Sequence, residues 1–125
     1  MRMFGSIATL FLVGCPSADS GGVAVRGKVE YFGQPLAGGM IVFTPDADRG
    51  ESGSLGSATI EQDGTYALKP AEGTGMKPGW YRVTVAPPPG VGERFPSHFR
   101  NPQSSGLTRE VKRGEENVIE FTLQP

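Results

Sequence analysis

Apolar and polar residues alternate with a period of two along most of the chain after residue 22. Val25, Gly27 and Val29, for example, alternate with the charged Arg26 and Lys28. Such alternation is typical of a strand that buries one face and exposes the other. Either this pattern or a short apolar run bounded by turn residues occurs in seven segments: 23–31, 40–44, 56–60, 65–69, 80–85, 107–111 and 117–123. We therefore predict seven short strands.

Turn-forming residues separate the predicted strands. The chain contains 19 Gly and 11 Pro, and many of them fall between the apolar runs. Proline fixes φ near −65° and glycine accepts positive φ, so both favour tight reversals. The residues that we predict to form turns are Gly33, Pro35, Asp63, Gly64 and Gly79. One apolar sheet face must be covered by another, so we predict an all-β fold, a seven-stranded antiparallel β-sandwich of immunoglobulin-like architecture.

The first fourteen residues form a separate segment. Arg2 precedes an apolar run over residues 3–13, which is the pattern of a secretory signal peptide. The run is too short to span a bilayer as a helix. Its end, Leu12-Val13-Gly14-Cys15, resembles the lipobox of bacterial lipoproteins.

The lipobox resemblance implies a lipid anchor. Cleavage would fall between Gly14 and Cys15, the thiol of Cys15 would carry diacylglycerol, and the new amino group would carry a further acyl chain such as palmitate. Several acyl chains on one residue hold a protein stably on a membrane. Two alternatives stay open for this cysteine: a buried free thiol and an intermolecular disulfide.

The sequence thus divides into three parts: a signal peptide over 1–14, a lipidated cysteine and flexible tether over 15–22, and a folded domain over 23–125. The residue after Cys15 is Pro16, and Asp19 lies too far along to act as an inner-membrane retention signal. We expect a cell-envelope protein, anchored to membrane lipid and facing the periplasm or the cell surface, with the outer membrane favoured.

Several motifs in the folded part occur in the order found in one known domain family. They are Val25-Arg26-Gly27-Lys28-Val29, Gly33-Gln34-Pro35-Leu36-Ala37-Gly38, Ile41-Val42-Phe43-Thr44-Pro45, Asp63-Gly64-Thr65-Tyr66 and Pro78-Gly79-Trp80-Tyr81-Arg82-Val83-Thr84-Val85. Together they resemble the carboxypeptidase regulatory-like, or transthyretin-like, domain. The resemblance implies a prealbumin-like sandwich, an accessory or structural role without catalytic residues or cofactors, and for a few relatives the binding of carbohydrate or protein.

Charge and reactive side chains narrow the functional classes. With 20% charged residues and a net charge of −1, the chain offers no basic patch for nucleic acid. His98 is the only histidine, and although Ser104 and Ser105 lie nearby in sequence, no nucleophile-elbow motif surrounds them. One predicted loop contains three acidic residues, Asp46, Asp48 and Glu51. Such a group could bind calcium, or the loop could simply be solvated. We favour the solvated loop.

The longest stretch without a strand pattern is 86–106. It includes Phe95, His98, Phe99 and Arg100, which could form a binding loop for a glycan or a partner protein. In the alternative interpretation, which we favour, the two phenylalanines fold back to close one end of the core. The function expected from the sequence is a non-catalytic, membrane-anchored structural or binding module that contacts an envelope protein or glycan. The alternative is a metal-dependent or hydrolytic envelope enzyme with an unrecognised site.

Overall fold

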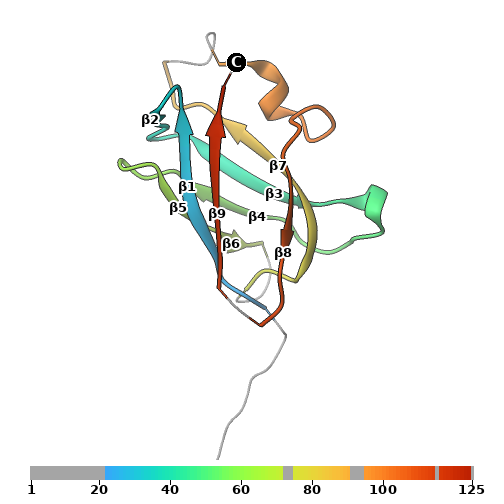
Figure 1. The fold of residues 1–125 in the computed structure, drawn as a ribbon. Coiled ribbons are helices and arrows are strands. Elements are labelled where there is room, and N and C mark those ends of the chain that lie inside the picture. The colour runs from blue at the N-terminus through green and yellow to red at the C-terminus, as the bar shows by residue number, and fades with distance from the viewer. Residues whose placement is uncertain (1–21, 72–74, 91–94, 115, 125) are drawn as a thin grey trace, which may run out of the picture.

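Two β-sheets packed face to face make up the part of the chain that the computed structural model describes, residues 22–71, 75–90, 95–114 and 116–124 (Figure 1). This confirms an all-β, two-sheet architecture. No helix within these ranges has the length and apolarity needed to cross a bilayer. Residues 1–21, which include the predicted signal peptide and Gly14 and Cys15, lie outside the described residues.

The first sheet is centred on β1 (Val25–Tyr31). On one side, β1 pairs antiparallel with two short strands, β2 (Gln34–Pro35) and β5 (Thr65–Ala67). On its other side it pairs in parallel with β9 (Asn117–Leu123). The prediction of a wholly antiparallel sandwich is therefore wrong at this pair. Alternation with period two is common to both kinds of strand pairing, so the sequence pattern does not distinguish them.

The second sheet is antiparallel throughout and has the order β6-β4-β3-β7-β8. Its strands are β3 (Met40–Pro45), β4 (Gly56–Thr59), β6 (Lys69–Pro70), β7 (Gly79–Ala86) and β8 (Thr108–Val111). Two 3-10 helices, η1 (Ala47–Arg49) and η3 (Ser97–Arg100), lie in the connections.

The described residues contain nine strands where we predicted seven. Each of the seven predicted segments contains a strand; β2 is additional, and the segment 65–69 contains both β5 and the first residue of β6. The predicted strand over 65–69 is divided at Leu68, because its first half pairs with β1 in one sheet and its second half pairs with β4 in the other. A short strand that changes sheets keeps a continuous sequence pattern, which is why the division was not predicted.

The core fills the space between the sheets with alternate residues of the long strands. Phe43 lies at its centre, with its ring centroid 6.0 to 6.3 Å from those of Tyr66, Tyr81 and Phe121. The other fully buried large side chains are Ile41, Ile60, Met76, Leu123, Val29, Val83, Val85 and Val111. Removal of this apolar surface from water is the main favourable term in folding, at about 25 cal/mol for each Å² buried.

Candidate functional site

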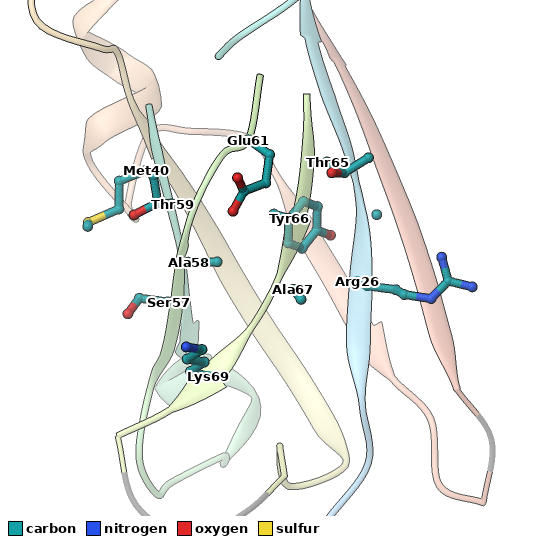
Figure 2. A pocket seen from close by; sticks show the side chains of 11 residues that line it. Arg26, Met40, Ser57, Ala58, Thr59, Glu61, Thr65, Tyr66, Ala67 and Lys69 are labelled. Carbon is teal, nitrogen blue, oxygen red and sulfur yellow. The ribbon is translucent and has the colours of Figure 1, made fainter. Parts of the chain in front are cut away.

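A half-open groove of about 700 Å³ lies where β4 of the second sheet approaches β5 of the first sheet (Figure 2). Small and hydroxyl-bearing side chains predominate in its lining. The lining residues are Arg26, Gly27, Met40, Ser57, Ala58, Thr59, Glu61, Thr65, Tyr66, Ala67 and Lys69. A cavity of this size is within the range of small-ligand sites.

The groove forms because the hairpin over residues 55–71 opens in its middle. At its tip the N–H of Glu61 donates to the Thr65 carbonyl, and at its base the N–H of Ala71 donates to the Leu55 carbonyl. Between these points β5 leaves β4 and pairs with β1 instead. Thr59 and Ala67 would face each other in a closed hairpin, but no strand pairing joins them. The switch of one strand between sheets therefore creates the opening.

Tyr66 forms the inner wall of the groove. Its hydroxyl donates a hydrogen bond of 2.7 Å to the carbonyl oxygen of Ile119 on β9, and its ring passes over Gly27 of the intervening strand. Burial raises the pKa of the Tyr66 hydroxyl well above its usual value near 10. A tyrosine hydroxyl is protonated at neutral pH, and the raised pKa keeps this one a hydrogen-bond donor into alkaline solution.

Charged and hydroxyl groups line the mouth of the groove. Figure 2 shows the Glu61 carboxylate directed towards the groove and the Arg26 side chain directed away from it. Arg26 instead pairs with Glu116, Nε to Oε2 at 2.7 Å, and this hydrogen bond lowers the pKa of the Glu116 carboxyl. The Thr65 hydroxyl donates to Asp63 at 2.7 Å. The groove thus offers both hydrogen-bond donors and hydrogen-bond acceptors, and this combination suits an uncharged polar ligand.

The acidic loop after β3 is held by arginine. Asp46 is buried, and its carboxylate accepts hydrogen bonds from Arg82 Nε at 2.9 Å and from the N–H of Asp48 at 3.1 Å. Arg82 also donates to Asp48 at 2.7 Å, and Arg49 approaches Asp46 at 3.3 Å. The interpretation of this loop as solvated is wrong for Asp46, because its carboxylate is buried and paired with Arg82. The sequence pattern did not indicate this pair, since Arg82 lies on β7, far along the chain. Among the described residues no three His, Cys, Asp or Glu side chains are grouped to hold a metal ion.

The residues of the predicted binding loop point in different directions. Phe95 and Phe99 are 4% and 5% exposed and belong to the core, where Phe95 packs against Tyr31 at a centroid distance of 5.1 Å. His98 and Arg100, also in or beside η3, are exposed. This placement favours the interpretation in which the two phenylalanines close one end of the core. It does not favour the interpretation in which all four residues form one binding surface.

The hydroxyl groups of the two serines near His98 form hydrogen bonds with backbone atoms. The Ser104 hydroxyl donates to the backbone carbonyl of His98 at 3.2 Å, and the Ser105 hydroxyl accepts from the N–H of Leu107 at 3.2 Å. Both serines therefore stabilise the turn between η3 and β8.

Of the predicted turn residues, Gly33, Asp63 and Gly64 lie at reversals of the chain, whereas Pro35 lies in β2 and Gly79 is the first residue of β7. Gly33 and Gly64 have φ of 76° and 89°, and Gly79 has φ of 147°. Asp63 accepts from the N–H of Thr65, and Pro35 lies in β2 against Gly64. Sequence reasoning missed the groove itself, because the pattern of β4 and β5 does not show that the hairpin opens. No model of a protein family matches the chain, and no curated protein matches it.

Proposed function

We propose that the chain is a non-catalytic lipoprotein of the bacterial cell envelope, anchored through Cys15, whose transthyretin-like domain binds an envelope glycan or protein segment in the groove between β4 and β5. The anchor is inferred from Leu12-Val13-Gly14-Cys15, as in lipoprotein precursors. The groove supports the binding role, because it places hydroxyl groups, one carboxylate and one ammonium group at a half-open surface between the two sheets.

The single observation that carries the binding role is the open hairpin. Thr59 and Ala67 lie on neighbouring strands but are not paired. The small side chains of these strands therefore line a concave surface between them. A closed hairpin would fill this space with its own hydrogen bonds. An opening lined by small residues and hydroxyls admits an uncharged polar chain, such as a sugar backbone or an extended peptide.

The anchor is tested by labelling cells with radioactive palmitate. The native chain is expected to incorporate the label, whereas the C15A variant is expected to remain an unlabelled precursor of higher mass. Mass spectrometry of the native protein would disprove the anchor if it found an intact Met1 and an unmodified Cys15 thiol.

The groove is tested separately with Ala67→Arg, which places a long charged side chain across an exposed position of its lining. The matched control is Gln62→Arg, which adds the same charge at an exposed turn residue outside the lining. Binding of purified envelope glycan and of the envelope protein fraction is measured for the full-length chain. We expect Ala67→Arg alone to abolish binding to one of the two fractions, and equal binding by both variants would contradict the groove.

A further inference from the structure

The edges of the two sheets differ in how they are protected against the addition of another strand. Beside β1, the edge strands β2 and β5 have two and three residues, and β2 includes a proline. At one edge of the second sheet, β6 consists of Lys69 and Pro70, and at the other β8 has four residues that include Arg109 and Glu110. Short length, proline and charge are the features by which natural sheets prevent strand addition.

The remaining edge, β9, is long, has no proline and carries a single charge, that of Glu120. It runs for seven residues without proline, lysine or arginine, and within the described residues it pairs only with β1 (Figure 1). The N–H of Asn117 donates to the Ala24 carbonyl and the N–H of Phe32 donates to the Leu123 carbonyl. In this parallel register the odd-numbered residues of β9 bond to β1.

The even-numbered residues of β9 consequently direct their backbone groups away from the sheet. Val118, Glu120 and Thr122 present three N–H and three C=O groups at the edge, and their side chains are exposed. Val118 is 52% exposed, an unusual position for a large aliphatic side chain. The edge thus offers both a hydrogen-bonding ladder and an apolar contact.

The core behind this edge is already closed. The guanidinium of Arg109 lies over the Phe121 ring at 4.8 Å, and the Asn117 side chain makes two hydrogen bonds to the backbone of Lys112, at 2.8 and 3.0 Å. These contacts join β8 and the residue after it to Phe121 and Asn117 of β9, across the two sheets. A further strand could therefore pair with β9 without opening the sandwich.

We propose that the β9 edge binds an extended segment of a partner protein as an additional antiparallel strand, with a basic residue opposite Glu120 and an apolar residue opposite Val118. These two positions are two apart on the partner, so both side chains lie on one face of its strand. This interaction surface lies apart from the groove and does not depend on the lipid anchor, so it goes beyond the function proposed above.

Charge distinguishes this partner from a second copy of the chain. Residues 117–123 include one acid and no cation, so no register of β9 against another β9 places a positive charge opposite Glu120. The symmetric register centred on this residue brings two Glu120 side chains together, which is destabilising. On the same face, Lys28 of β1 is paired with Glu30 at 3.7 Å.

Two synthetic seven-residue peptides test the proposal. Both have threonine at most positions and valine at position five, and position three is lysine in one and glutamate in the other. NMR of the full-length chain in mild detergent follows amide hydrogen exchange at Val118, Glu120 and Thr122. We expect the lysine peptide to slow exchange at these three amides and to bind about tenfold or more tightly than the glutamate peptide.

Two variants locate the contact. Glu120→Lys is expected to reverse the preference between the peptides. Thr122→Pro removes an N–H that points away from β1, so the β1 amides should keep their protection while peptide affinity falls about tenfold or more. Equal binding of both peptides, or unchanged exchange at millimolar peptide, would overturn the proposal. Protection that is present without peptide and is lost on dilution would assign the edge to a second copy and also overturn it.

Discussion

Tyr66 on β5 donates its phenolic hydrogen to the carbonyl oxygen of Ile119 on β9, across the full width of β1. The 2.7 Å contact links the two strands that flank β1. It exists because the residue of β1 beneath the tyrosine ring is Gly27. One tyrosine thus forms the inner wall of the groove and also joins both sides of the first sheet.

Replacing this tyrosine measures the hydrogen bond. Tyr66→Phe keeps the ring contacts with Phe43 and Phe121 but leaves the Ile119 carbonyl without this donor. We expect the free energy of unfolding to fall by about 0.5 to 1.5 kcal/mol, the usual net contribution of one intramolecular hydrogen bond, because the Ile119 carbonyl still faces β1 in the parallel ladder. Urea unfolding monitored by circular dichroism measures the change, and an unaltered midpoint would show that the bond contributes nothing.

The same burial predicts a loss of stability in alkali. Burial raises the pKa of Tyr66 and, to a smaller extent, that of Tyr81, above the unfolded value of about 10. Above this pH the unfolded chain releases these protons while the folded chain retains them, so stability is complete below about pH 10 and declines as pH rises. The limiting slope from one such tyrosine is about 1.4 kcal/mol for each pH unit.

Unfolding measured between pH 8 and 11 tests this slope. Native protein is expected to lose stability above pH 10 more steeply than Tyr66→Phe, because the variant has lost the most strongly shifted phenol. Parallel curves for the two proteins would indicate that Tyr66 titrates normally in the folded state.

The strands and turns were largely predictable because they depend on local patterns. Alternating residues such as Tyr81, Val83 and Val85 are buried as expected, and Gly64 adopts positive φ after Asp63. The features that were not predictable depend on which distant segments meet. Pairing of Arg82 with Asp46, 36 residues apart, is an example.

The groove could not be predicted for the same reason. Residues 65–69 have the pattern of one continuous strand, yet pairing with β1 withdraws Thr65–Ala67 from β4. Pairing with β1 places the Tyr66 ring in the core beside Phe43 and Phe121. The local sequence of the hairpin does not indicate whether residues 65–67 pair with β4 or with β1.

Gly27 should tolerate no side chain. A Cβ at this position would overlap the Ile119 carbonyl oxygen and lie 3.0 Å from the Tyr66 ring. Gly27→Ala must therefore displace β9 from β1, and we expect a loss of about 3 kcal/mol or more in unfolding free energy. The matched control is Gly114→Ala, where φ is +84° but no atom lies within 4 Å of the added Cβ.

The control should lose only about 1 to 2 kcal/mol, which is the conformational cost of a left-handed alanine. Chemical denaturation of both variants provides the comparison. Equal losses would mean that the close approach of β1 and β9 is readily relaxed.

Removal of Arg82 should be much more damaging than removal of Arg49. Both contact the buried Asp46, but the side chain of Arg82 is 23% exposed and that of Arg49 is 52% exposed. We expect Arg82→Met to cost about 2 to 4 kcal/mol, because it leaves a buried carboxylate without its main partner. Arg49→Met should cost less than about 1 kcal/mol, as for other exposed pairs. Thermal unfolding of the two variants would contradict this ranking if their melting temperatures were equal.

Phe32 occupies a conformation that a different residue would adopt with less strain. Its φ is 56° and that of Gly33 is 76°, so these two residues form the two-residue loop of a type I′ turn between β1 and β2. Asparagine is favoured at the first loop position, whereas a bulky residue with positive φ is an outlier. The side chain is 63% exposed, and its ring contacts Tyr31 at a centroid distance of 4.6 Å.

Phe32→Asn should therefore stabilise the domain. Relief of the backbone strain is worth about 1 kcal/mol, which exceeds the contribution of a largely exposed ring and corresponds to a rise in melting temperature of about 4 to 8 °C. Calorimetry of the native chain and the variant measures this difference. Phe32→Leu is the control, because it retains a bulky apolar residue in the strained position and should show no such rise. A lower melting temperature for Phe32→Asn would mean that packing against Tyr31 outweighs the strain.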